Sequence, residues 1–398
     1  MSMRLRSAAL AASLTCFAAL GSVALARPVT APGPGRDQPA EFVELAKELL
    51  GAAACGDDTP PAAMPPKLFA AHCAQVHATQ TQYRDRWVTP ARAFFAQHVP
   101  GDVPRKVVYP FAGGDLSTAL TVYPDADEIT TISLEPAGDP RSLRALPAQA
   151  LQEAMLQVRR ELRFLYVVNF SNTKNMIQAM RGGRLPTQLI FGLSALHLHG
   201  FEPTSLRYFE IEEDGSLRYL TEQDAELIGD AGKADAGRRN RRFANIELRF
   251  KRPGTAREQI YRHIAYNLND ANLEKDPRLL RHLEAKGDVA AMTKAASYLM
   301  SYDDFSQIRG YLLSRARWMV SDATGVAPKW GRDAGFEYET WGQFDDAHMA
   351  AGRKIAKEWR KEWRAEPKRE LRFRFGYPDR QRRNHLVIMR RTKSAQGK

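Results

Sequence analysis

A glycine-rich turn between two short apolar runs most constrains the fold of this chain. The first run, Val-Val-Tyr-Pro-Phe at 107–111, is followed by Ala-Gly-Gly-Asp at 112–115. Residues 116–123 have helical character, and residues 129–134 form a run rich in β-branched side chains that ends at Glu135. The order strand, glycine turn, helix, strand is typical of the first unit of a parallel α/β sheet. We therefore expect an α/β protein with a Rossmann-like sheet.

The same turn supplies the candidate site residues. Glycines let the backbone turn sharply so that a helix N-terminus can face a ligand, and an acid about 20 residues further on can bind ribose hydroxyls. Glu135 follows Gly114 by 21 residues. Asp115 and Glu135 would both project at the carboxyl edge of the sheet, where open α/β folds bind ligands. We expect these two carboxylates to be catalytic, and Phe111, Gly113 and Gly114 to contact the ligand.

This unit resembles the opening unit of the class I methyltransferases, which bind S-adenosylmethionine on a Rossmann-like sheet. Gly113 takes the place of the family's middle glycine, and Glu135 that of its ribose-binding acid. Tyr109 stands where the family usually has an acid, and Phe111 where it has its first glycine. The resemblance implies a nucleotide-type scaffold. A working methyltransferase, a Rossmann-like scaffold with a changed site and an ordinary buried unit all remain open.

Four segments resemble those of a family of secreted bacterial proteins of uncharacterised activity. They are Tyr-Pro-Phe-Ala-Gly-Gly-Asp at 109–115, Leu-Glu-Pro at 134–136, Lys-Ala-Ala-Ser-Tyr-Leu-Met at 294–300 and Phe-Ser-Gln-Ile-Arg at 305–309. The resemblance covers residues 105–390. It implies a common fold and export, but it transfers no catalytic residue.

The first residues of the chain predict export. Arg4 and Arg6 precede an apolar stretch at 8–19, and the Ala-Leu-Ala that ends at Ala26 fits the small-x-small pattern of signal peptidase. We expect cleavage after Ala26 and a flexible, proline-rich leader at 27–40. An uncleaved anchor is the alternative, although the apolar run is short for a membrane span. The mature protein would be periplasmic or secreted and would have no transmembrane segment.

Export would place the two remaining cysteines in an oxidising compartment. We expect Cys55 and Cys73 to form a disulfide within a helical cap at 41–104, the alternative being two buried thiols too far apart to bridge. These cysteines and their neighbouring histidines fit no common zinc spacing. We therefore expect no metal site.

The rest of the chain alternates between helical and extended patterns. We expect residues 105–391 to form the Rossmann-like domain, with a mixed sheet and late antiparallel strands, and residues 392–398 to be a disordered tail. The expected helices are 41–51, 66–77, 90–98, 151–162, 173–180 and 189–199. The expected strands are 165–168, 205–212, 216–220, 246–250, 258–266, 318–321, 371–375 and 386–389, with a polar loop at 222–245.

Three further aspartates are candidates for acid–base chemistry. Asp303, Asp304 and Asp322 could supply an acid and a base if the fold returned them to the carboxyl edge of the sheet. Asp303 and Asp304 fit equally well as the N-terminal cap of a helix at 305–317, which is the commonest role of aspartate at that position. Asp322 begins an Asp-Ala-Thr-Gly sequence typical of a turn.

Composition supports a folded protein with a basic surface. The chain has 398 residues, 44% of them hydrophobic, and 58 Lys and Arg against 46 Asp and Glu, a net charge of +12. Arginine-rich segments at 238–242, 353–364 and 380–383 would attract anions. An exported protein meets acidic envelope polymers before nucleic acid, so nucleic acid is the weaker partner hypothesis.

Our leading functional hypothesis is an exported envelope enzyme that acts on an anionic substrate at the glycine turn. The alternatives are a non-catalytic binding protein for anionic envelope components and an S-adenosylmethionine-dependent methyltransferase. The sequence identifies neither a cofactor nor an oligomeric state, and it leaves open whether the protein is catalytic.

Overall fold

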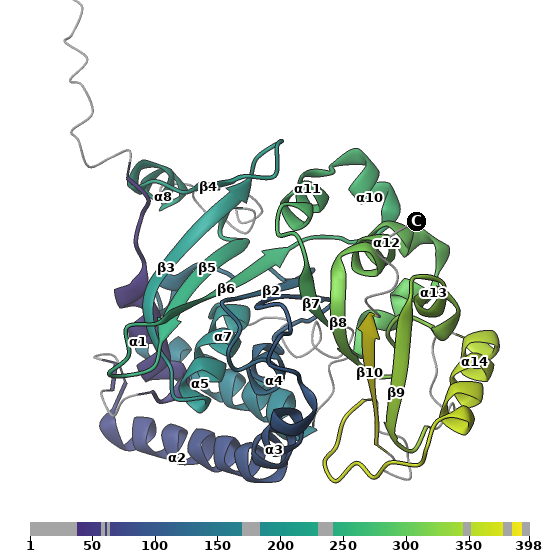
Figure 1. Ribbon diagram of the computed structural model, residues 1–398. Coiled ribbons are helices and arrows are strands. Elements are labelled where there is room, and N and C mark those ends of the chain that lie inside the picture. Colours follow the sequence, from purple (N-terminus) through teal and green to yellow (C-terminus); the bar gives the residue numbers. More distant parts are fainter. Residues whose placement is uncertain are drawn as a thin grey trace, which may run out of the picture.

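The computed structural model describes residues 38–56, 60–61, 64–168, 184–229, 242–344, 352–376 and 384–391. A ten-stranded sheet forms its centre, in the order β4-β3-β5-β6-β2-β1-β7-β8-β10-β9 (Figure 1). Five neighbouring strands are parallel: β6 (Glu258–Ala265), β2 (Glu128–Ser133), β1 (Lys106–Pro110), β7 (Val289–Thr293) and β8 (Ala316–Ser321). The predicted signal peptide at 1–26, nearly all of the leader and the tail at 392–398 lie outside the described residues.

Antiparallel strands extend the sheet on both sides, which confirms the predicted Rossmann-like mixed sheet. One side continues through β5 (Asn245–Lys251), β3 (Glu202–Ile211) and β4 (Leu217–Tyr219), and the other through β10 (His385–Arg391) and β9 (Phe336–Gly342). The turn between β3 and β4 contains Gly215, whose φ of 88° lies in the left-handed region that favours glycine. The predicted hairpin and the predicted strand at 386–389 are both confirmed.

Side chains of the strands point alternately into two apolar layers, one on each face of the sheet. In β1, Val107 and Tyr109 face one layer and Val108 faces the other. Because parallel strands are buried on both faces, they carry continuous apolar runs such as the one that predicted β1. Helices cover both faces (Figure 1).

The helices divide between the two faces according to their place in the chain. The first layer contains α1 (Val43–Ala54), α2 (Pro66–Tyr83), α3 (Thr89–His98), α4 (Leu116–Val122), α5 (Ala148–Arg163) and α7 (Thr187–Leu198). The second contains α10 (Asp270–Lys275), α11 (Arg278–Glu284), α12 (Ser306–Arg315), α13 (Pro328–Asp333) and α14 (Gly352–Ala365).

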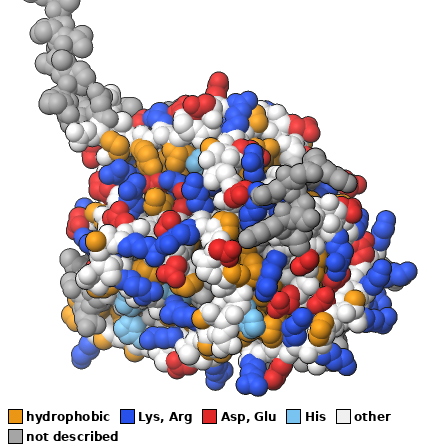
Figure 2. All heavy atoms as spheres, in the orientation of Figure 1, with side chains coloured by type: hydrophobic (Ala, Val, Ile, Leu, Met, Phe, Trp, Pro, Cys, Tyr) orange, Lys and Arg blue, Asp and Glu red, His pale blue; other side chains and the backbone are white. Residues whose placement is uncertain are grey.

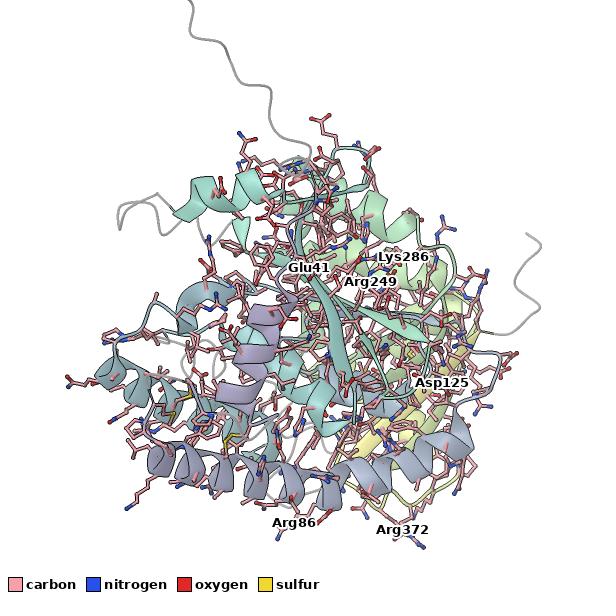
Figure 3. The ribbon with its side chains drawn as sticks, turned by 90° about the vertical axis from the view of Figure 1, so that its left-hand side faces the viewer. Glu41, Arg86, Asp125, Arg249, Lys286 and Arg372 are labelled. Atoms are coloured by element: carbon pink, nitrogen blue, oxygen red, sulfur yellow. A yellow bond between two sulfur atoms is a disulfide. The ribbon has the colours of Figure 1, made fainter. Side chains whose placement is uncertain are left out.

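The N-terminal helices form the predicted helical region, and the predicted disulfide joins two of them. Cys55 at the end of α1 and Cys73 in α2 are bonded, with their Cα atoms 5.4 Å apart (Figure 3). Glu41 attaches the start of α1 to β3, because its carboxylate accepts hydrogen bonds from Ser205 Oγ and the Leu206 amide, both at 2.6 Å. Helices α1 and α2 also contact α7 and α5.

The C-terminal segment at 371–375 is not the strand that its alternating apolar residues predicted. Strand β10 is already paired on both sides, with β8 and β9. Phe373 and Phe375 instead pack against α3, where the ring of Phe95 lies 5.9 Å and 6.2 Å from theirs. The Arg374 carbonyl accepts a hydrogen bond from Trp87 Nε1 at 2.6 Å. This segment therefore lies beside the N-terminal helices.

Two other predictions are wrong, and one cannot be compared with the structure. The apolar run at 165–168 belongs to a π-helical turn, Phe164–Val168, that continues α5, because a short apolar run does not by itself distinguish a buried helix from a strand. The loop predicted at 222–245 begins with a helix, α8 (Glu222–Gly229). The helix predicted at 173–180 lies outside the described residues. Within the described part of the chain, no helix is both long enough and apolar enough to span a membrane.

Candidate ligand site at the carboxyl edge of the sheet

The chain order of the parallel strands reverses beside β1. Across the sheet, β6, β2, β1, β7 and β8 are the third, second, first, fourth and fifth parallel strands in the chain, as in the doubly wound sheets that bind dinucleotides. Such sheets bind ligands outside the carboxyl ends of the strands, near the point of reversal. Residues 111–115 follow β1, and Glu135 lies two residues beyond β2, so both predicted groups lie at this edge.

The turn after β1 has a strained backbone. Phe111 has a φ of 59°, in the left-handed region that favours glycine, and its ring packs 5.8 Å from that of Phe305. A non-glycine residue in this conformation costs roughly 1–3 kcal/mol. Gly114 serves packing, because a Cβ at this position would lie 2.2 Å from Cδ2 of Phe191 in α7.

Asp115 is buried and has donors from three side chains. It accepts hydrogen bonds from Thr118 Oγ1 at 2.6 Å and from Tyr109 Oη at 3.0 Å. Lys294, the residue after β7, forms an ion pair with it at 2.8 Å. The side chains of Asp115 and Lys294 are only 9% and 6% exposed. All three of these donors belong to the protein itself, and removal of one partner of the buried ion pair would leave a charge uncompensated.

Aromatic side chains cover this ion pair. The Lys294 ammonium lies 6.0 Å from the ring centroid of Trp87 and 5.6 Å from that of Phe375. Trp87 in turn stacks on Tyr83 at 5.3 Å. The pKa of Tyr109 is raised well above its ordinary value by burial and by the charge of Asp115, so its hydroxyl stays protonated and donates to the carboxylate. The carboxyl edge between β1 and β7 is therefore occupied by the protein's own side chains.

Glu135, beyond the end of β2, has the opposite surroundings. The residue is only 7% exposed, yet within the described part of the chain no donor reaches its buried Oε2. The same holds for Ser133 Oγ, at the end of β2, and for Gln188 Oε1, in α7. A buried acceptor without a hydrogen bond costs about 1–3 kcal/mol. Such atoms commonly mark a place where water or a ligand completes the hydrogen bonding.

A hydrogen-bond network fixes the orientation of Gln188. Its Nε2 donates to the Gly113 carbonyl at 2.7 Å and lies 3.2 Å from His263 Nδ1. The other nitrogen of His263, Nε2, lies 2.7 Å from the Glu135 carbonyl, which can only accept, so Nε2 carries the proton. Burial lowers the pKa of His263 to about 4, so the ring is neutral and Nδ1 accepts. The amide of Gln188 is therefore turned so that Oε1 is left without a donor.

The chemistry of this edge follows from these atoms. The Glu135 carboxylate and the Gln188 carbonyl oxygen can only accept hydrogen bonds, and the Ser133 hydroxyl can accept one. A ligand that satisfies them must present O–H or N–H donors. These three residues and His263 form what we call the β2-tip site. Glu135 was predicted from its spacing from the glycine turn. Gln188 and His263 were not predicted, because they are 75 residues apart in the chain and only the fold brings them together.

The other predicted acids do not join this site. Asp303 and Asp304 are exposed and do not cap α12; Asp270 does, accepting hydrogen bonds from the amides of Ser306 and Gln307 at 2.9 Å and 3.0 Å. The capping residue thus comes from α10 and could not be identified by its distance along the chain. Asp322 is buried and accepts a hydrogen bond from the Thr324 amide at 2.8 Å, as in the predicted turn.

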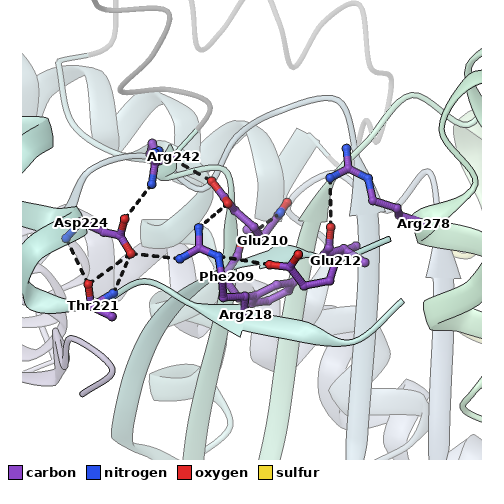
Figure 4. Close-up of polar contacts among 10 residues, drawn as sticks. Phe209, Glu210, Glu212, Arg218, Thr221, Asp224, Arg242 and Arg278 are labelled. Carbon is purple, nitrogen blue, oxygen red and sulfur yellow. Dashed lines mark hydrogen bonds and ion pairs between the residues drawn. The ribbon is translucent and has the colours of Figure 1, made fainter. Parts of the chain in front are cut away.

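Arg242, the one described residue of the predicted positive segment at 238–242, is paired with acids within the protein. Arg242 pairs with Asp224 at 2.9 Å, and Arg218 pairs with the same carboxylate at 3.0 Å (Figure 4). Glu210 and Glu212 add further ion pairs to Arg218. These contacts join α8 to the hairpin of β3 and β4. Residues 238–241 of the same segment lie outside the described residues.

The described residues contain no cluster of three or more His, Cys, Asp or Glu that could hold a metal ion. Comparisons with known proteins found no match: no family model, curated protein sequence or solved structure is similar to this chain.

Proposed function

We propose that this protein binds a small molecule rich in hydroxyl donors at the β2-tip site, and that a nucleoside is the ligand class that fits best. The observation that carries the proposal is the buried Glu135 oxygen without a donor. A carboxylate at the tip of the second parallel strand is the group that binds ribose hydroxyls in doubly wound sheets. The strand order and the glycine turn support the same ligand class.

The surroundings of the two predicted carboxylates favour binding over acid–base catalysis. Asp115 is engaged by Lys294, Tyr109 and Thr118, so its oxygens already have partners within the protein. Glu135 retains an acceptor for a ligand hydroxyl. The proposal departs from the hypothesis of an anionic substrate at this turn, because a site composed of acceptors repels anions. The disulfide supports a protein that functions in an oxidising compartment such as the cell envelope.

An S-adenosylmethionine-dependent methyltransferase is the second candidate. The strand order favours it, together with Gly113 and Glu135 at the positions of the middle glycine and the ribose-binding acid. S-adenosylmethionine also carries an ammonium group, which would satisfy a further acceptor. Phe111 in place of the first glycine is the feature that separates this chain from the methyltransferase pattern.

A thermal-shift screen tests the proposal, because a ligand that binds the native state raises the melting temperature. The panel contains adenosine, S-adenosylmethionine, sugar phosphates and anionic envelope fragments. We expect a shift with the ribose-containing ligands that is lost in Glu135→Gln and kept in Glu202→Gln, an exposed control at the start of β3. A shift with S-adenosylmethionine but not adenosine would favour the methyltransferase. No shift with any ribose-containing ligand would contradict the proposal.

A further inference from the structure

A groove of about 870 Å³ lies beyond the end of β9, away from the β2-tip site. Its walls come from the end of β9, from α14 and from the segment that follows α14. Strand β9 is antiparallel to β10, which is antiparallel to β8, so β9 ends at the same edge as the parallel strands. The groove therefore also lies at the carboxyl edge of the sheet. We call it the α14 groove.

The charges that line the α14 groove are predominantly positive. Its cationic residues are Arg360, Arg364, Lys368 and Arg369, and its acidic residue is Glu370. Glu370 is paired with Arg372, outside the groove, at 3.1 Å. Arg369 is paired with Glu366 at 3.1 Å. Basic side chains gather over α14 at the right-hand side of Figure 2.

Arg364 and Lys368 are exposed and unpaired. Among the described residues, no carboxylate forms an ion pair with either of them. This separates them from Arg242, which lies between two acids. Arg360 and Arg364 are also four residues apart on one helix, where like charges repel. Arg364 and Lys368 thus present positive charge to the groove with no carboxylate paired to them among the described residues, as a surface that binds anions would.

The rest of the groove suits a ligand with a ring and hydroxyl groups. Trp363 and Phe344 form an apolar wall, their rings stacked 5.2 Å apart at 24°. Gln343 and Asn384 add side-chain amides, which can both donate and accept hydrogen bonds. A phosphorylated sugar has groups that match all three features. Its phosphate would contact the cations, the apolar face of its ring would contact the aromatic wall, and its hydroxyls would bond to the amides.

We propose that the α14 groove binds the phosphorylated sugar of an envelope glycan or glycolipid. The proposal is independent of the β2-tip site, since the groove is rich in cations and that site is rich in acceptors. Arg364 and Lys368 contact the phosphate, and Trp363 contacts the sugar ring. The same chemistry occurs on a free sugar phosphate and on a lipid headgroup, so the test includes both sources.

The experiment compares two double variants of the whole chain. Arg364→Glu with Lys368→Glu reverses the two unpaired charges of the groove. Lys354→Glu with Lys357→Glu makes the same change of charge on exposed residues of the same helix that do not line the groove. Binding of glucose 1-phosphate is measured by calorimetry, and binding of phosphatidylcholine vesicles that contain lipid A, a phosphorylated glycolipid, by co-sedimentation. Glucose and inorganic phosphate are the control ligands.

We expect the groove variant to bind about tenfold more weakly and the control variant to stay within about twofold of the wild type. Binding of glucose 1-phosphate would identify a free sugar phosphate as sufficient, and binding of lipid A vesicles alone would identify the lipid-borne form. Equal losses of affinity in the groove variant and the control variant would overturn the proposal. It would also be overturned if inorganic phosphate bound as tightly as glucose 1-phosphate, or if the wild type bound neither glucose 1-phosphate nor the lipid A vesicles. If the reversed variant unfolds, Arg364→Gln with Lys368→Gln gives the same comparison.

Discussion

Strand β2 carries a glutamate near each end, and the two side chains have opposite surroundings. Glu128, at the amino end, pairs with Lys286 and Arg262, and Arg262 also pairs with Glu247 at 2.8 Å. Lys286 is labelled in Figure 3. Glu128 is half-buried, whereas Glu135, beyond the carboxyl end, is buried and has an oxygen that no donor in the described part of the chain reaches.

Under the proposed function, this difference separates a carboxylate that supports the fold from one that binds a ligand. Burial opposes the ionisation of Glu128, but the charges of Lys286 and Arg262 outweigh it and lower its pKa to about 2. Ligands of open α/β sheets bind at the carboxyl edge, so nothing at the amino edge needs to remain unsatisfied. Folding stability should therefore depend on Glu128 and ligand binding on Glu135.

The largest loss of stability is expected when the buried ion pair of Asp115 and Lys294 is broken. Like Glu128, Asp115 is paired within the protein. Removing one partner of a buried ion pair leaves an uncompensated charge, so Lys294→Met should lower the free energy of unfolding by about 3–5 kcal/mol. Denaturant titration measures the loss. Asp115→Asn combined with Lys294→Met should recover part of it. A single variant as stable as the wild type would show that the pair does not support the fold.

The next effect is the pH dependence that Glu128 confers. Its pKa is lower in the folded protein than in the unfolded chain, so its stabilisation is present above about pH 4.5 and is lost as the pH falls towards 2. The full contribution is about 3 kcal/mol. Glu128→Gln should remove most of this stability at pH 7 and flatten the acid limb of the unfolding curve. If the variant and the wild type lose stability equally as the pH falls, Glu128 does not support the fold in this way.

Glu161 is an intermediate case, a buried carboxyl held by neutral donors only. Gln157 Nε2 and Thr187 Oγ1 donate to it at 2.9 Å and 3.0 Å, and burial, which outweighs these bonds, raises its pKa to about 7. Its contribution to stability is present below about pH 4.5 and is lost as the pH rises through 7. Glu161→Gln should therefore stabilise the protein by about 3 kcal/mol at pH 8 and have little effect at pH 4. Thermal unfolding at the two pH values measures the difference, and equal effects at both would contradict it.

The smallest effect on stability is expected at Glu135. Its buried oxygen forms no hydrogen bond that a substitution could break, so Glu135→Gln should change the free energy of unfolding by less than about 1 kcal/mol. Glu128→Gln is the matched control on the same strand. If Glu135→Gln lowers the free energy of unfolding as much as Glu128→Gln does, the two carboxylates do not differ in their contribution to the fold, and the comparison is wrong.

The sequence predicted the parts of the fold that depend on local patterns. The glycine turn, the strands beside it and the helix at 189–199 follow from apolar runs and turn residues. It did not predict β7, because Val289-Ala-Ala-Met-Thr293 contains few β-branched residues and becomes a strand only between two neighbours.

In the candidate site too, the sequence predicted what depends on neighbouring residues and missed what depends on contacts between distant ones. Glu135 was predicted from its spacing, since the glycine turn and the tip of the next strand are close in the chain. The partner of Asp115 was not predicted, because Lys294 lies 179 residues away and only the sheet brings the two together. The same reason explains why the sequence could suggest a catalytic Asp115 but could not show that its charge is neutralised.

The central claim is that Glu135 accepts hydrogen bonds from the hydroxyls of a bound nucleoside. Calorimetric titration with adenosine and with 2′,3′-dideoxyadenosine, which lacks the 2′ and 3′ hydroxyls of the ribose, tests it directly. We expect the wild type to bind adenosine at least about tenfold more tightly, and Glu135→Gln to bind the two ligands nearly equally. Equal affinity of the wild type for the two ligands, or no affinity for either, would contradict the claim.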